Sequence, residues 1–238
     1  MIENSANSAA NAAANSGAQG SAAANPTADA SYVFNVLILD ESGSMGSIAS
    51  AAKEVFEGYL HRLIQEQQDI PDLTQYINMW TFGKPYVNEN IPLVKIRSWD
   101  KVFPEYSPSG NTPMFDAIGM SIHKLKESLR ILDLQKEQYQ VKVFIVSDGE
   151  ENASREYKAS QIGALIRGLI AEGWAFDYYG TDHDITSMAD TLNIESNRRV
   201  MFQKSKAGME SARDQYMAEI MKEKMSFMES RRSDSSKK

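Results

Sequence analysis

Two hydrophobic patterns alternate along the chain. Short runs of consecutive apolar and β-branched residues, such as Tyr32–Leu39 and Val141–Ser147, are typical of strands that are covered on both faces. Longer segments, such as Ser47–Gln67 and Met114–Leu132, carry apolar residues three or four positions apart, and this spacing predicts helices. Strands that alternate with helices in this way form a parallel sheet with helices on both faces. The pattern therefore predicts a three-layer α/β/α fold.

The remaining segments continue this pattern. Thr74–Phe82 and Tyr86–Ile96 are close enough to pair as an antiparallel hairpin. Pro92 in the second segment favours an edge position, because proline cannot donate a hydrogen bond to a neighbouring strand. We therefore expect a mostly parallel central sheet with one antiparallel edge strand. Further strands are predicted at Trp174–Gly180 and Arg199–Lys204, and further helices at Tyr157–Gly173, Ile185–Ile194 and from about Ala207 onward.

The two ends of the chain differ in composition from the part between them. Residues 1–30 are mostly Ala, Asn, Ser and Gly, and Glu3 and Asp29 are their only charged residues. Such a segment has little apolar surface to offset the entropy cost of ordering, so we expect a disordered tail. Residues 229–238 are predicted to form a second disordered tail. One domain is then expected over residues 31–228, including the C-terminal helix.

Composition narrows the possible functions. The chain has 238 residues and no cysteine, which excludes disulfides, cysteine-based zinc sites and a cysteine nucleophile. The formal net charge of −7 argues against nucleic-acid binding through a general basic surface. No apolar run approaches the roughly 20 residues of a membrane-spanning helix, and the first residues lack the basic start of a secretion signal. We expect a cytoplasmic protein that binds neither nucleic acid nor membranes.

Oxygen-bearing side chains follow two of the predicted strands and precede one predicted helix. They are Asp40, Ser42 and Ser44 after the first strand, Thr112 before the second helix, and Asp148 after the fourth strand. Ligands of open α/β sheets bind outside the carboxyl ends of the strands, so these side chains are expected to converge there. Each piece alone is more typical of a turn or a helix cap than of a metal ligand. Their joint occurrence, each next to the right element, favours one common site.

The five side chains form a donor set that suits a hard divalent ion. All five offer oxygen, which favours Mg²⁺, with Mn²⁺ also suited. Mg²⁺ binds about six oxygen ligands, and three hydroxyls with two carboxylates cannot fill that shell unaided. Waters or an incoming ligand must complete it. An acidic side chain from a partner could then take an open position.

These residues resemble the metal-ion-dependent adhesion site of von Willebrand factor type A (vWA) domains, in particular the small stand-alone bacterial and phage members. The D-x-S-x-S signature of the family matches Asp40, Ser42 and Ser44, its threonine matches Thr112 in "GNTP", and its second aspartate matches Asp148 in "SDGEEN". The resemblance covers about residues 32–217. It implies a Rossmann-like sheet, a bound divalent ion and protein binding. It also implies an adaptor or scaffold role, in some relatives beside AAA+ ATPases or in stress-related and phage-related systems.

Three functions are compatible with the sequence. The favoured one is a divalent-metal-dependent protein-binding module, in which bound Mg²⁺ accepts an Asp or Glu side chain of a protein partner. The second is a metal-dependent hydrolase or phosphatase with Asp40 as nucleophile. Ser42 stands where a second carboxylate would be needed, so we expect no enzymatic activity. The third is an interaction protein that binds through its tails and final helix, while the ion only stabilises the fold.

Two loops beside the predicted site carry further charged residues. His183, flanked by Asp182 and Asp184, should lie on the same edge of the sheet and could shape partner choice, although Asp184 as a helix cap is the simpler interpretation. Glu150 and Glu151 could also line the rim. For these two residues, solvated loop charges are the simpler interpretation.

Overall fold

A computed structural model describes residues 31–235 except residues 101, 103, 182–184 and 204. The predicted tail at residues 1–30 lies outside the described residues, as do residues 236–238 of the second predicted tail. The final helix continues to Ser235 and thus includes residues 229–235. This segment contains no glycine or proline that would end a helix.

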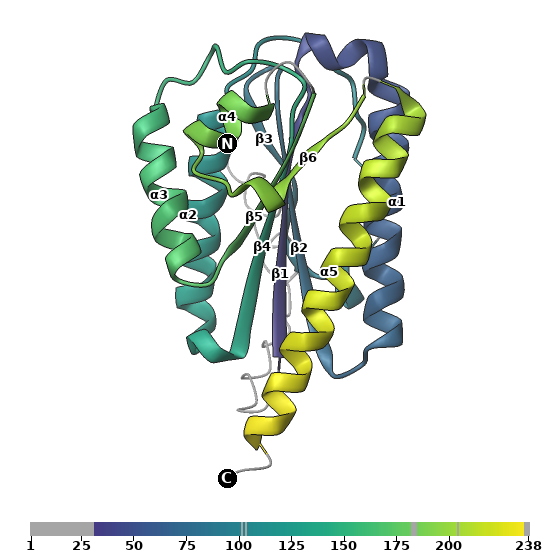
Figure 1. The fold of residues 1–238 in the computed structure, drawn as a ribbon, viewed down its shortest axis with the longest axis vertical. Coiled ribbons are helices and arrows are strands. Elements are labelled where there is room, and N and C mark those ends of the chain that lie inside the picture. The colour runs from purple at the N-terminus through teal and green to yellow at the C-terminus, as the bar shows by residue number, and fades with distance from the viewer. Residues whose placement is uncertain (1–30, 101, 103, 182–184, 204, 236–238) are drawn as a thin grey trace, which may run out of the picture.

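A six-stranded sheet forms the centre of the molecule (Figure 1). Its strand order is β3-β2-β1-β4-β5-β6, and every neighbouring pair is parallel except the antiparallel pair of β2 and β3. The predicted Rossmann-like, mostly parallel sheet with one antiparallel edge strand is therefore confirmed. The strands are β1 (Ser31–Asp40), β2 (Leu73–Phe82), β3 (Val87–Lys95), β4 (Tyr139–Val146), β5 (Ala175–Gly180) and β6 (Arg199–Met201).

The strands at the two edges of the sheet differ from those inside it. β3 carries Pro92, which is exposed as expected for an edge strand. β6 has only 3 residues and ends at Met201, before the predicted limit at Lys204. The next residue, Phe202, is buried in the core, and its N–H donates to the carbonyl of Gly180.

Helices cover both faces of the sheet, which confirms the three-layer arrangement. Figure 1 shows α2, α3 and α4 on one face and α1 and α5 on the other. Among the described residues, no helix combines the length and apolar character needed to cross a membrane. The helices are α1 (Ala49–Asp69), α2 (Met114–Leu132), α3 (Ala159–Ala171), α4 (Ile185–Thr191) and α5 (Lys206–Ser235), and a short 3₁₀-helix, η1 (Gly43–Ile48), precedes α1.

Strand residues alternate between two apolar layers. In β1, Phe34, Val36 and Ile38 belong to the layer that packs against α2 and α3, whereas Leu37 and Leu39 belong to the layer that packs against α1. All five side chains are buried. Coverage on both faces explains why this strand is a continuous apolar run.

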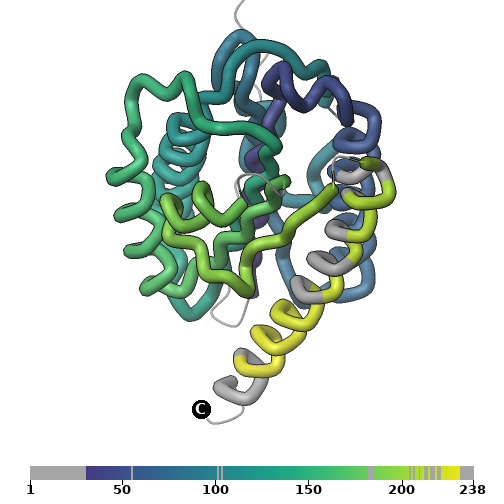
Figure 2. Tube along the Cα trace, turned by 45° about the horizontal axis from the view of Figure 1, so that its top comes forward, coloured from purple at the N-terminus to yellow at the C-terminus, as the bar shows by residue number. Residues whose placement is uncertain are grey.

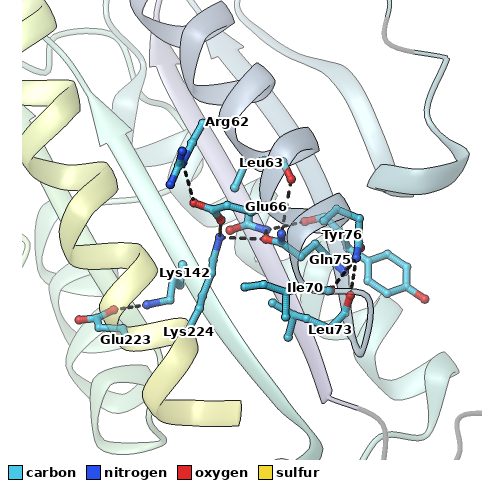
Figure 3. A network of polar contacts seen from close by, with 12 residues as sticks. Arg62, Leu63, Glu66, Ile70, Leu73, Gln75, Tyr76, Lys142, Glu223 and Lys224 are labelled. Atoms are coloured by element: carbon cyan, nitrogen blue, oxygen red, sulfur yellow. Dashed lines mark hydrogen bonds and ion pairs between the residues drawn. The ribbon is translucent and has the colours of Figure 1, made fainter. Parts of the chain in front are cut away.

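A buried ion pair helps to fix α5 against the rest of the domain. Lys224 of α5 is fully buried, and its Nζ donates to Glu66 Oε2 in α1 and to Gln75 Oε1 in β2, at 2.8 Å in each case (Figure 3). On the other side of the carboxylate, Arg62 Nε lies 3.4 Å from Glu66 Oε1. Glu66 is also fully buried, so the charge of Lys224 depends on Glu66 for compensation, while Glu66 is compensated by Lys224 and Arg62.

The neighbouring residue of α5 makes a second charged contact with the sheet. The carboxylate of Glu223 accepts hydrogen bonds from the buried Lys142 of β4 and from Arg198. Arg198 also lies 3.3 Å from Asp177 of β5. Glu223 and Lys224 of α5 therefore carry charges that match opposite charges on β4, on Arg198 and on α1.

The strand order reverses beside β1, where β2 lies on one side and β4 on the other. The chain therefore leaves β1 and β4 toward opposite faces, and open α/β sheets bind ligands at such a point. β1 ends at Asp40, and β4 ends at Val146, directly before Ser147 and Asp148. Figure 2 turns this edge of the molecule toward the viewer.

Candidate metal centre

Asp40 lies at the centre of this edge and is fully buried. Its Oδ1 accepts the N–H of Ser42 at 2.7 Å, and its Oδ2 accepts the hydroxyl of Ser147 at 2.5 Å. Burial raises the pKa of Asp40 to about 6, although these hydrogen bonds oppose the rise, and the nearby charge of Asp148 adds to it. A cation at this point would stabilise the ionised form.

Ser42, Ser44 and Asp148 are joined by hydrogen bonds across the edge of the sheet. The hydroxyls of Ser42 and Ser44 are 3.0 Å apart, and the hydroxyl of Ser44 donates to Asp148 Oδ1 at 2.7 Å. The loop after β1 and the loop after β4 thus meet through their side chains, as the sequence predicts.

Gly149 provides the space in which the oxygens gather. A Cβ atom on this residue would lie 3.2 Å from Ser44 Oγ, 3.7 Å from Thr112 Oγ1 and 3.9 Å from Asp40 Oδ2. Thr112 Oγ1 and Asp40 Oδ2 therefore both lie within 4 Å of one point, the position that this Cβ would take. Any side chain larger than hydrogen at position 149 would fill this space.

The donor chemistry of this space fits a hard divalent ion. Oxygens of Asp40, Ser44 and Thr112 surround the space beside Gly149. The side chains of Ser42 and Asp148 are hydrogen-bonded to Ser44. Among the described residues, no three His, Cys, Asp or Glu side chains gather as a metal site. An ion here would depend on hydroxyls as much as on carboxylates, which is chemistry that Mg²⁺ or Mn²⁺ accepts. That these five residues bind metal stays a prediction.

Glu41 supports the site in a way that the sequence does not reveal, because the D-x-S-x-S signature leaves its position open. Its side chain is buried, and Oε1 accepts the N–H of Ser107 at 2.6 Å. Its carbonyl accepts the N–H of Ser109 at 2.8 Å. Gly83, directly after β2, lies so close to this carbonyl that a Cβ atom would overlap with it. The position therefore requires glycine. Glu41 thus fixes the loop that leads to Thr112.

Two other side chains hold Asp40 in place and were not predicted. Ser147 donates to the carboxylate of Asp40, as described above, and the hydroxyl of Tyr106 donates to the Asp40 carbonyl at 2.5 Å. Burial raises the pKa of Tyr106, and the charges of Asp40 and Glu41 add to this effect, so Tyr106 remains a neutral donor. Tyr106 belongs to no motif found in the sequence, and Ser147 begins "SDGEEN" but was assigned no role.

Glu151 is not a solvated loop charge, and this interpretation from the sequence was wrong. Its Oε2 accepts the N–H of Phe115 at 2.9 Å, and its Oε1 accepts the N–H groups of Ala153 and Ser154. The first contact satisfies a free amide at the start of α2, where Pro113 makes no side-chain cap bond. The loop after β4 therefore caps a helix from another part of the chain.

The same loop is anchored a second time by Asp116 of α2, which is fully buried. Its carboxylate accepts the N–H groups of Arg155, Glu156 and Tyr157 and the hydroxyl of Tyr86. Although burial favours the neutral acid, these donors hold the pKa of Asp116 below its usual value. The predicted rim residues Asp182, His183 and Asp184 lie outside the described residues.

Comparisons with known proteins identify the fold. No protein-family model and no curated protein matches the sequence. Solved structures do match, among them the VWA domain of SpRpn10, at 16% identity and a TM-score of 0.52, with 76% of this chain and 94% of that chain covered. The manganese-loaded TRAP protein of Plasmodium vivax matches at 16% identity and a TM-score of 0.51, with 76% of this chain and 71% of that chain covered.

A third match is the pilus adhesin SpaC from Lactobacillus rhamnosus GG, at 13% identity and a TM-score of 0.59, with 81% of this chain covered. The chain spans less than half the length of several matched proteins, and 30% in the case of SpaC. Identities this low establish the fold alone. The protein has a vWA-like fold, as the resemblance of its motifs implied.

Proposed function

We propose that the chain is a protein-binding module that depends on a divalent metal. In this proposal Mg²⁺, or Mn²⁺, is bound by Asp40, Ser42, Ser44, Thr112 and Asp148. When bound, the ion supplies an open coordination position for an Asp or Glu side chain of a protein partner. The chain would then act as an adaptor or scaffold.

The observation that carries this proposal is that oxygens of Asp40, Ser44 and Thr112 lie around the space beside Gly149. Ser42 and Asp148 are hydrogen-bonded to Ser44, so the five side chains from three separate segments form one cluster. Only two of the five are carboxylates, and the carboxylate of Asp40 is already engaged by Ser42 and Ser147. Neutral hydroxyls as ligands would leave much of the ion's charge uncompensated. A carboxylate from a partner is the ligand that such an ion favours.

The structural comparisons support the same class of function. One protein of similar fold is described as manganese-loaded and another as an adhesin, at the low identities given above. The cytoplasmic location, the lack of enzymatic activity and an AAA+ ATPase or a stress-related or phage-related protein as partner remain predictions. A metal-dependent phosphatase would be revealed by phosphoester turnover that Asp40→Ala abolishes, and this result would overturn the binding proposal.

Calorimetric titration with Mg²⁺ tests the metal site directly. We expect the parent chain to bind Mg²⁺ and Asp148→Ala to bind it much more weakly, because one of the two charges is lost. The fold should survive, since loss of Asp148 relieves its repulsion of Asp40. Equal affinity in the two proteins would refute the assignment.

Co-purification from the native host tests the binding role. A partner retained in Mg²⁺ but released by EDTA, and not retained by Thr112→Ala, would support capture through the ion. Substitution of single Asp and Glu residues of that partner by Asn and Gln would then identify the acid that binds. A partner that Thr112→Ala retains would favour binding through the tails or the final helix instead.

A further inference from the structure

Asn152 joins the loop after β4 to the residue that precedes the α2 cap. Its side-chain Oδ1 accepts the backbone N–H of Thr112 at 3.0 Å, and its backbone N–H donates to the Thr112 carbonyl at 3.2 Å. The two bonds close a ring between segments that are 40 positions apart in the sequence. One side of this ring continues directly from Asp148 and Gly149, and the other carries the Thr112 hydroxyl.

Thr112 depends on its backbone for its position in the site. Ser42, Ser44 and Asp148 are linked side chain to side chain, and Asp40 holds the N–H of Ser42. Within the part of the chain that the structure describes, the Thr112 hydroxyl makes no hydrogen bond to these four residues. The position of the Thr112 hydroxyl beside Gly149 therefore depends on the hydrogen bonds of the Thr112 backbone N–H and carbonyl.

We propose that Asn152 is a positioning residue, which sets the Thr112 hydroxyl beside Asp148 before an ion binds. The inference rests on the proposed metal site and adds a residue that the five-residue signature does not contain. Glu151 and Asp116 fix the same loop, but to later residues of α2. Asn152 alone among these three side chains bonds to Thr112 itself.

Loss of the Asn152 side chain should weaken metal binding without unfolding the domain. The side chain is exposed, so its removal leaves no cavity in the core. Residues that orient metal ligands typically change metal affinity by about 10–100-fold when they are replaced. We expect a loss in this range for Asn152→Ala.

The experiment is calorimetric titration of the full chain with Mg²⁺, together with melting temperatures measured in EDTA and in Mg²⁺. Asn152→Asp keeps an oxygen that can accept the Thr112 N–H, and its added charge cannot weaken cation binding. It should therefore retain the parent affinity or exceed it. The matched control is Asn111→Ala, which truncates the same residue type at an exposed position next to Thr112 and should bind as the parent does.

The outcomes separate positioning from general stability and from the metal site itself. A positioning role predicts a nearly unchanged melting temperature in EDTA and a smaller rise with Mg²⁺ for Asn152→Ala. Equal Mg²⁺ affinity in the parent and Asn152→Ala would refute the role of Asn152 and leave the metal site intact. A parent chain that binds no Mg²⁺ would refute the metal site and this inference together.

Discussion

Replacement of either partner of the Lys224–Glu66 pair should destabilise the domain more than replacement of both. Both side chains are fully buried, and the two groups are 2.8 Å apart. Removal of Glu66 leaves Lys224 without its buried counterion, and removal of Lys224 leaves Glu66 with only the partly exposed Arg62, 3.4 Å away. Breaking a buried pair in this way costs about 3–5 kcal/mol. Replacement of a whole buried pair by apolar residues is often neutral or stabilising by about 1–4 kcal/mol.

The variants are Glu66→Met, Lys224→Met and the double replacement, which keep similar side-chain volumes. Urea unfolding in EDTA, followed by tryptophan fluorescence and far-UV circular dichroism, gives the free energy of unfolding for each. We expect the double variant to be more stable than the sum of the single effects predicts, by at least about 2 kcal/mol. Gln75 loses a donor in two of the variants, but Asn35 Nδ2 remains 3.4 Å from its Oε1.

Additive effects would contradict this reasoning. If the double variant lay within about 0.5 kcal/mol of the summed single effects, the two charges would be energetically independent. The pair would then contribute nothing to the position of α5 beyond the packing of its two side chains. In the double variant, α5 would retain its apolar contacts through Met221, Phe227 and Met228. Any change in its stability would then report on the ion pair and not on loss of the helix from the core.

The pH dependence of stability provides a second measure of the same site. Burial lowers the pKa of Lys224 from 10.5 to about 8; the charge of Glu66 opposes the shift, and the charges of Lys142 and Arg62 add to it. Between these two values the unfolded chain binds more protons than the folded chain, so the free energy of unfolding should rise with pH. The rise should be present in the parent and absent in Lys224→Met. Parallel curves for the two proteins would contradict the shifted pKa.

Three further predictions follow from the site and its supports. Gly149→Ala should weaken Mg²⁺ binding and keep the fold, because its Cβ would lie 3.2 Å from Ser44 Oγ and would displace one of the oxygens. Gly168→Ala, where a Cβ meets nothing within 4 Å, is the control in the calorimeter. Asp116→Ala should lower the free energy of unfolding by at least about 2 kcal/mol in urea titrations, because three backbone N–H groups and the Tyr86 hydroxyl lose their common acceptor. Since the folded pKa of Asp116 is below its usual 3.8, this difference should be present above pH 3.8 and fade as the pH falls further; a difference independent of pH would contradict it.

The layers of the fold could be predicted because each strand and helix carries its own pattern. β1 is apolar on both faces and stops at Asp40, and α2 follows a proline, so both were found close to their observed limits. The convergence of Asp40, Thr112 and Asp148 followed from the rule that parallel strands end at one edge. Local sequence was sufficient for the strands and helices, and the general rule for parallel sheets was sufficient to bring their ends together.

The supports of the site and the attachment of α5 could not be predicted in this way. Lys224 and Glu66 are 158 positions apart, and their charges would ordinarily indicate exposed helix positions. Glu41 and Glu151 likewise gave no signal, because a glutamate in a loop is usually solvated. In each case the partner comes from a distant segment, and only the tertiary structure brings the two together.

The two edge strands described earlier have a consequence for behaviour at high concentration. An exposed strand edge offers free N–H and C=O groups to other molecules and is a common start of aggregation. Pro92 interrupts the row of donors on β3, and β6 offers only 3 residues for pairing. Stacking of this sheet with copies of itself into fibrils is therefore disfavoured at both ends.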